Sequence, residues 1–223
     1  MIKAVIFDMY ETLITHYRSP LYFGAHMAAD AGIAEADFLK YWRPTEEARS
    51  VGNLTTEEAI ELVLRENDCY SAETLEKIMQ RRIAAKKACF EQLHKEILPL
   101  LQSLKEKGIL IGLISNCFSE EARVIRESIL FPYFDAAYLS FEQKVQKPNP
   151  VIFERCMSEL GVTAKECLYV GDGGSNELQA AEKLGMKALQ ANWYLQEGTN
   201  QPTSFMKEYR GLRTPLDVLN YLN

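Results

Sequence analysis

Hydrophobic and polar residues follow three different patterns along the chain, and each pattern covers one continuous region. Residues 2–7 form a short apolar run rich in β-branched residues, which ends at Asp8. From about Pro20 to Leu93 the apolar residues recur at helical spacing, and no strand-like run interrupts them. After His94, short apolar runs alternate with amphipathic segments. The patterns therefore predict a strand, a helical insertion and an alternating β/α region.

The helical insertion contains two well-marked helix starts. Thr55 and Glu58 form a capping box ahead of one amphipathic segment, and Ser71 caps the next one. We expect residues 18–93 to fold as a small helical bundle. The core of the protein would then consist of residues 1–17 and 94–223.

Four more strands are predicted in the alternating region. They are expected near residues 109–114, 136–139, 167–170 and 186–189, the last of these being the final strand. Helices of the observed length between strands imply right-handed crossovers and a parallel sheet that is covered on both faces. The predicted fold class is α/β, a doubly wound parallel sheet with an inserted helical domain.

The end of the chain has two predicted features. A polar loop covers residues 196–204, and we assign no function to it. A short helix with Leu216, Leu219 and Leu222 on one side follows, and we expect it to pack on the core.

Composition and charge narrow the class of protein. The 223 residues are 47% hydrophobic and 25% charged, which is typical of a globular chain. The formal charge of −6 argues against nucleic acid or an anionic membrane as the main partner. Five cysteines, an odd number without metal-knuckle spacing, indicate reduced thiols.

The distribution of apolar runs predicts a cytoplasmic protein. Charged residues at Lys3 and Asp8 leave no apolar segment for a secretory signal. The longest uncharged apolar run, residues 109–118, is about half as long as a membrane-spanning helix requires. These patterns predict no membrane partner and give no information about the oligomeric state.

Three of the predicted strands end in a polar residue, namely Asp8, Ser115 and Asp172. An aspartate after a single strand is weak evidence, because aspartate is common in turns. However, the carboxyl ends of parallel strands meet at one edge of a sheet, where ligands bind. The three residues together therefore indicate a ligand site.

The residues around these strand ends resemble the four motifs of the haloacid dehalogenase (HAD) superfamily of hydrolases. The matching residues are Val5 to Leu13, then Ser115 with Asn116, then Lys147 before Pro148, and finally Gly171 and Asp172 through Glu177. The match covers nearly the whole chain, including a helical insertion such as members with a C1-type cap have. The resemblance implies a Rossmannoid core, a mobile cap and an aspartate nucleophile.

The resemblance also implies a chemistry for each motif. Asp8 would attack phosphorus and form an aspartyl phosphate that water hydrolyses. Mg²⁺ would reduce the charge repulsion, held by Asp8, the backbone carbonyl of Tyr10 and Asp172, with Glu177 assisting.

The phosphoryl group itself would be held by Ser115, Asn116 and Lys147. The expected substrate is a small phosphorylated metabolite. Lys144, three residues before Lys147, competes for the role of the lysine.

Tyr10 departs from the family pattern. Most phosphatases of the family have a second aspartate at this position, which acts as the general acid. An unperturbed phenol has a pKa near 10, so it would be a poor base for activating water at pH 7, and substrates with a basic alkoxide leaving group are in doubt. His16 is a candidate replacement for the acid. The alternative interpretation is that His16 lies in a surface loop and has no catalytic role.

Two other functions follow from this departure. Tyrosine at this position also resembles the 2-haloacid dehalogenases, in which halide leaves without a proton. Asp172 and Glu177 favour a metal-dependent phosphatase, because two acids beside a metal-free pocket would repel an anionic haloacid. The third hypothesis is a catalytically degenerate protein that binds a phosphorylated ligand.

Overall fold

The computed structural model describes residues 1–195 and 203–223. In this part of the chain, six parallel strands form one sheet in the order β3-β2-β1-β4-β5-β6. The strands are β1 (Ala4–Phe7), β2 (Leu110–Ser115), β3 (Ala136–Leu139), β4 (Cys167–Gly171), β5 (Lys187–Ala191) and β6 (Arg210–Leu212). Phe7 of β1 lies opposite Leu113 of β2 and Val170 of β4. The predicted α/β fold with a doubly wound parallel sheet is confirmed.

The prediction that the strand near residues 186–189 is the last one is wrong. β6 pairs with β5, and Gly211 lies opposite Gln190. β6 has only three residues and one of them is glycine, so no apolar run marks it in the sequence. The helix predicted around Leu216 forms as a 3₁₀ helix, Pro215–Tyr221, and packs on the core as expected. Of the predicted polar loop, residues 196–202 lie outside the described part of the chain.

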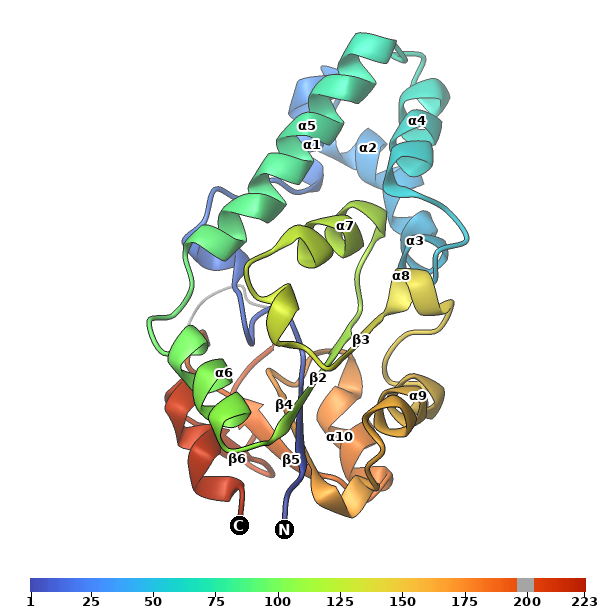
Figure 1. The fold of residues 1–223 in the computed structure, drawn as a ribbon. Helices are drawn as coiled ribbons and strands as arrows, with labels where there is room; N and C mark the ends of the chain where they lie inside the picture. Colours follow the sequence, from blue (N-terminus) through green and yellow to red (C-terminus); the bar gives the residue numbers. More distant parts are fainter. Residues whose placement is uncertain (196–202) are drawn as a thin grey trace.

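Helices cover both faces of the sheet (Figure 1). One face carries α6 (Ile97–Glu106), α7 (Ser119–Glu127) and the last 3₁₀ helix, and the other face carries α9 (Pro150–Leu160) and α10 (Glu177–Lys183). A short α8 (Ser140–Gln143) follows β3. Val5 and Phe7 face the first layer, whereas Ala4 and Ile6 face the second. β1 is buried on both faces, which explains its continuous apolar run.

Five α-helices between β1 and α6 form the insertion and occupy the upper part of Figure 1. They are α1 (Gly24–Ala31), α2 (Glu35–Trp42), α3 (Glu46–Ser50), α4 (Thr56–Glu66) and α5 (Ala72–Ala88). The predicted caps are present, since Thr55 accepts a hydrogen bond from the Glu58 amide and Ser71 accepts one from the Thr74 amide. The insertion has its own hydrophobic cluster, separate from the two clusters against the sheet. This helical insertion is what a C1-type cap requires.

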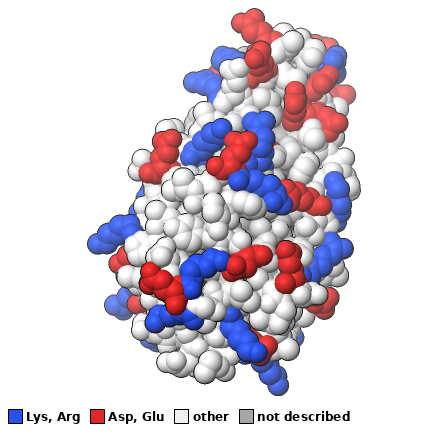
Figure 2. Space-filling view, in the orientation of Figure 1, with Lys and Arg blue, Asp and Glu red and all other residues white. Residues whose placement is uncertain are grey.

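The distribution of charged side chains and the state of the cysteines agree with what the composition predicts. On the face drawn in Figure 2, basic and acidic side chains are interspersed. All five cysteines are free thiols. No helix within residues 1–195 and 203–223 is long and apolar enough to cross a lipid bilayer.

Gly112 in β2 allows α9 to pack closely on the sheet. A Cβ atom at this position would lie 3.0 Å from Cys156 Sγ, 3.0 Å from Ile6 Cγ1 and 3.1 Å from Leu160 Cδ1. We expect Gly112→Val to lower the free energy of unfolding by about 1–3 kcal/mol, because the added carbons have no free space. Urea denaturation measures this change, and an unchanged unfolding midpoint would contradict it.

Candidate active site

The carboxyl ends of β1 and β4 bring three carboxylates together. Asp8 follows β1, Asp172 follows β4, and Glu177 is the first residue of α10. One oxygen of each carboxylate lies within 4.8 Å of the others. The Asp8 amide donates to the Val170 carbonyl at 3.0 Å, which aligns the two strand ends. All three side chains belong to buried residues.

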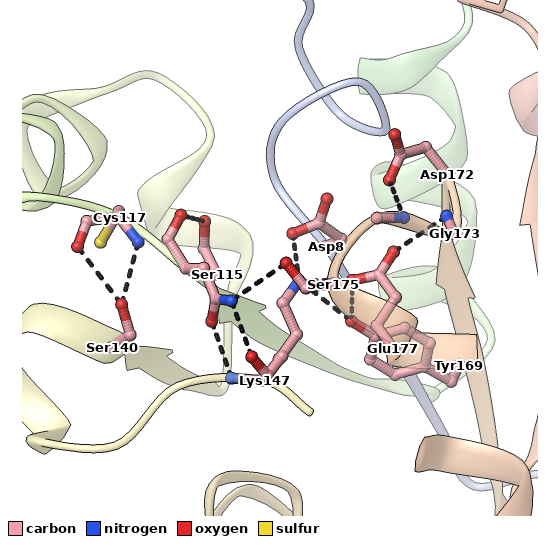
Figure 3. A network of polar contacts seen from close by, with 12 residues as sticks. Asp8, Ser115, Cys117, Ser140, Lys147, Tyr169, Asp172, Gly173, Ser175 and Glu177 are labelled. Atoms are coloured by element: carbon pink, nitrogen blue, oxygen red, sulfur yellow. Dashed lines mark hydrogen bonds and ion pairs between the residues drawn. The ribbon is translucent and has the colours of Figure 1, made fainter. Parts of the chain in front are cut away.

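Lys147 lies between two of these carboxylates (Figure 3). Its Nζ atom is 2.5 Å from Asp8 Oδ1 and 2.5 Å from Glu177 Oε2. The Tyr169 hydroxyl donates to Glu177 Oε2 at 2.8 Å and lies 3.3 Å from the Lys147 ammonium. Lys147 is only 3% exposed, so water weakens these ion pairs little.

Asn116 holds the backbone of Lys147 on both sides. The Lys147 amide donates to Asn116 Oδ1 at 2.8 Å, and Asn116 Nδ2 donates to the Lys147 carbonyl at 3.0 Å. The same Nδ2 also donates to Ser175 Oγ at 3.2 Å. Lys144, the competing lysine, instead donates to the Gly52 carbonyl in the insertion. The structure therefore places Lys147, and not Lys144, among the carboxylates.

Ser115 is placed differently from the other predicted site residues. It is fully buried, and its hydroxyl makes a long contact of 3.5 Å with the Asn116 carbonyl. Asn116 lines the hollows above the carboxylates, whereas Ser115 does not. The role of the Ser115 hydroxyl in holding a phosphoryl group stays a prediction.

The site holds more negative than positive charge, with three carboxylates around one ammonium group. Burial raises the pKa of Asp8 well above its usual value, and Glu177 raises it further while Lys147 opposes the rise. Burial and then Glu177 raise the pKa of Asp172 to about 6. Burial alone would lower the pKa of Lys147, but Asp8 and Glu177 hold it above its ordinary value. A bound cation would therefore relieve repulsion between these carboxylates.

The donor set suits Mg²⁺, which prefers oxygen ligands from one or two carboxylates together with water. Asp172 Oδ1 accepts a hydrogen bond from the Gly174 amide at 2.9 Å, and Glu177 Oε1 accepts one from the Gly173 amide at 3.2 Å. Asp172 Oδ1 and Glu177 Oε1 each have a second lone pair beyond this bond. The three carboxylates can thus hold a divalent cation without losing their protein partners.

Two adjoining hollows open above the carboxylates. The smaller one, about 310 Å³, is lined by the three carboxylates and by residues of the segment between β1 and α1, including Tyr17. The larger one, about 810 Å³, lies between the insertion and the core and includes Arg43, Glu46 and Glu47 of the insertion. The residues common to both hollows are Tyr10, His16, Asn116, Lys147 and Ser175.

Tyr10 lines both hollows at the position where the family pattern has a general acid. Its ring is stacked on His16, with ring centroids 4.6 Å apart and an angle of 9° between the planes. Its hydroxyl is buried without a hydrogen-bond partner among the described residues. Burial and then Glu121 raise the pKa of the phenol well above its usual value. Tyr10 is therefore a weak proton donor here.

His16 is not a surface loop histidine, because its side chain is only 19% exposed. Its Nε2 atom is 2.8 Å from Lys86 Nζ and its Nδ1 atom is 3.1 Å from Glu11 Oε1. Burial and then Lys86 lower the pKa of the His16 ring. With both ring nitrogens occupied and the ring neutral, His16 is also a weak candidate for the missing acid.

The insertion is joined to the core by a buried group of charges, which we call the cap–core ion cluster. It consists of Arg82 and Lys86 of α5 with Glu120 and Glu121 of α7, all at most 5% exposed. Arg82 Nε lies 2.5 Å from Glu120 Oε1, and Lys86 Nζ lies 2.7 Å from Glu121 Oε1. Thr56 of α4 adds a hydrogen bond to Glu120. The cluster extends to the candidate site through the contact of Lys86 with His16.

Four residues around the candidate site are not indicated by any sequence pattern. Arg82 and Lys86 are four residues apart and share one helix face, but charged residues on a helix usually face solvent. Thr203 donates to Asp172 Oδ2 at 2.6 Å, and Gln190 donates to the Asp172 carbonyl at 2.8 Å. No motif or periodicity marks these two residues.

The fold and the site together define a class of protein, a doubly wound α/β enzyme with a helical cap and a carboxylate site at the carboxyl edge of its sheet. The model of the haloacid dehalogenase-like hydrolase family matches residues 2–185. The chain belongs to this family.

Individual relatives include both phosphatases and dehalogenases. The chain is 28% identical over 197 residues to glyceraldehyde 3-phosphate phosphatase of Methanopyrus kandleri, covering 83% of this chain and 82% of the relative. The fold is similar to 2-haloacid dehalogenase from Pseudomonas syringae, with a TM-score of 0.68, 20% identity and coverage of 99% and 97%.

A second similar structure was solved with ligands. It is an aspartate-to-alanine variant of a HAD family enzyme from Bacteroides thetaiotaomicron, in complex with magnesium and inorganic phosphate. The TM-score is 0.63 at 19% identity, and the match covers 91% of this chain and 98% of that enzyme. At these identities the two solved structures establish the shared fold.

The charge on Glu121 should stabilise the docked insertion in a pH-dependent way. Burial alone would raise the pKa of Glu121, but Lys86 and Arg82 hold it at about 2, below the usual 4.5. The stabilisation is complete above the unfolded-state pKa and is lost as the pH falls from about 4.5 toward 2. We expect Glu121→Gln to lower the free energy of unfolding by about 3–5 kcal/mol at pH 7, because two buried cations lose a partner.

Glu127→Gln on the same helix is the matched control. Glu127 pairs with Lys87, and both side chains are about half exposed (52% and 53%), so we expect a change below about 1 kcal/mol. Urea denaturation at pH 7, 5 and 3 compares both variants with the wild type. Equal effects of the two substitutions, or a Glu121→Gln effect that does not shrink with acidification, would contradict the role of the cluster.

Proposed function

We propose that the protein is a Mg²⁺-dependent phosphatase that transfers a phosphoryl group from a small phosphorylated metabolite to Asp8 and then to water. The observation that carries this proposal is the buried set of three carboxylates around Lys147, which has the charge and the oxygen donors for a divalent cation. The phosphatase of Methanopyrus kandleri and the magnesium and phosphate complex of the Bacteroides enzyme support it.

Asp8 has one carboxylate oxygen on Lys147, and the other is its nucleophilic atom in this proposal. It attacks phosphorus, the bond from phosphorus to the substrate oxygen breaks, and the electron pair leaves with that oxygen. Water then attacks the phosphorus of the aspartyl phosphate, the bond from phosphorus to Asp8 breaks, and the water loses a proton to solvent as phosphate and the Asp8 carboxylate are released. Asp8, Asp172, Glu177 and the Tyr10 carbonyl would hold Mg²⁺, which would supply positive charge that offsets the repulsion between the carboxylate and the phosphoryl group.

Lys147 and Asn116 line the smaller hollow and would contact the phosphoryl oxygens together with the Ser115 hydroxyl. The rest of the substrate would occupy the larger hollow between the two parts of the molecule. We therefore propose residues 18–93 as the cap and residues 1–17 and 94–223 as the core. Closure of the cap would exclude water from the first step and select the substrate.

Tyr10 favours one alternative function, 2-haloacid dehalogenation with Asp8 as the nucleophile. In that reaction the halide leaves without a proton, so a general acid is unnecessary. The similar fold of the Pseudomonas syringae dehalogenase is compatible with this alternative. The buried charge of Asp172 and Glu177 favours the phosphatase, because the two carboxylates would repel an anionic haloacid in the absence of a cation.

Phosphate release from an aryl phosphate and an alkyl phosphate tests the nucleophile and the cation separately from the missing acid. An aryl leaving group needs little protonation, so we expect Mg²⁺-dependent release from the aryl ester and slower release from the alkyl ester. Asp8→Asn should reduce aryl phosphate turnover by at least about a thousandfold, because the amide is a poor nucleophile. Chelation of Mg²⁺ should have a similar effect.

The outcomes separate the three hypotheses. Loss of release in Asp8→Asn supports the phosphatase. Release of halide from 2-haloacids, together with no phosphate release, would support the dehalogenase. Binding of phosphorylated ligands without turnover, unchanged in Asp8→Asn, would support the degenerate protein.

Lys147 and Lys144 provide a matched pair of variants. We expect Lys147→Met to reduce kcat/KM for the aryl phosphate by about a hundredfold or more, because the ammonium no longer neutralises Asp8 and the phosphoryl group. Lys144→Met should leave kcat/KM unchanged, since this side chain contacts the Gly52 carbonyl. Thermal unfolding of both variants checks that the loss is not due to unfolding, and equal activity of the two variants would contradict the assignment.

A further inference from the structure

Residues 203–206 lie against the loop that carries Asp172. Thr203 Oγ1 donates to Asp172 Oδ2 at 2.6 Å, and the Gly174 amide donates to Asp172 Oδ1 at 2.9 Å. Each oxygen of the Asp172 carboxylate therefore accepts a hydrogen bond from a different donor. One donor belongs to the loop itself, and the other comes from a segment about thirty residues further along the chain.

Gln190 of β5 holds this segment in place. It is fully buried, and its Nε2 atom donates to the carbonyls of Asp172 and Ser204, both at 2.8 Å. Its Oε1 atom accepts a hydrogen bond from the Met206 amide at 2.9 Å. A single buried amide thus ties the end of β4 to the segment, and such fully bonded buried groups are held rigidly.

Gly173 makes room for the segment. A Cβ atom on Gly173 would lie 2.6 Å from Met206 Sδ, and the φ angle of +104° at this position also disfavours other residues. The loop therefore allows the segment to approach closely enough for Thr203 to contact Asp172.

We propose that Thr203 is a positioning residue, which holds the Asp172 carboxylate facing Asp8 and Glu177 so that the three can bind Mg²⁺. This inference rests on the proposed function, because it assigns a role within the proposed metal site. Before a cation binds, Asp172 is buried beside other carboxylates that repel it. The hydrogen bond from Thr203 opposes rotation of the side chain away from them. Groups that orient metal ligands in this way commonly contribute a factor of about 10–100 to metal affinity.

Isothermal titration of the purified protein with Mg²⁺ at pH 7.5 tests this role without using phosphatase activity. We expect Thr203→Val to weaken Mg²⁺ binding about 10–100-fold, because valine has a similar shape but no hydroxyl donor. Thr203→Ser keeps the donor and should bind Mg²⁺ within a few-fold of the wild type. Ser204→Ala is the matched control, because Gln190 contacts the Ser204 backbone carbonyl and not its side chain.

A second measurement tests the same role. In phosphate-release assays, Thr203→Val should raise the Mg²⁺ concentration for half-maximal rate and recover wild-type kcat at saturating Mg²⁺. A loss of kcat that Mg²⁺ does not restore would contradict a positioning role.

The titrations distinguish failure of this inference from failure of the proposed function. Wild-type Mg²⁺ binding that is unchanged in Thr203→Val overturns the role of Thr203 alone. Absence of Mg²⁺ binding in the wild type overturns the metal site of the proposed function and the role of Thr203 with it.

Discussion

Mutual repulsion of three buried carboxylates is the constraint on which the candidate site depends. Asp8, Asp172 and Glu177 lie close together around the single ammonium of Lys147, and burial raises the pKa values of both aspartates. Carboxylates in this arrangement would separate or become protonated unless other groups held them.

The surrounding structure supplies those groups. Parallel pairing of β1 with β4 places Asp8 and Asp172 at one sheet edge, and the Asn116 side chain fixes the backbone that carries Lys147. Gly171 leaves space for the Glu177 carboxylate, because a Cβ atom on Gly171 would lie 2.0 Å from Glu177 Oε1. The site is thus held in place by groups from several elements.

The position of the insertion depends on a second set of buried charges, the cap–core ion cluster. Removing four charged groups from water is costly, and they are tolerated because each faces an opposite charge at short distance. Lys86 also contacts His16, whose ring stacks on Tyr10. The docked insertion therefore contacts a pair of rings that line both hollows.

Local sequence patterns are enough to predict the α/β class, the helical insertion and the residues around which the site forms. Buried parallel strands need continuous apolar runs, and helix starts need local capping groups, so β1 and the caps at Thr55 and Ser71 were visible in short stretches of sequence. Asp8, Lys147, Asp172 and Glu177 were found through motif order. Three features became visible only in the folded chain, namely the three-residue strand β6, the pairing of α5 with α7 and the contact of Thr203 with Asp172. These features depend on hydrogen bonds and ion pairs between residues far apart in the chain, which leave no periodic or local signal.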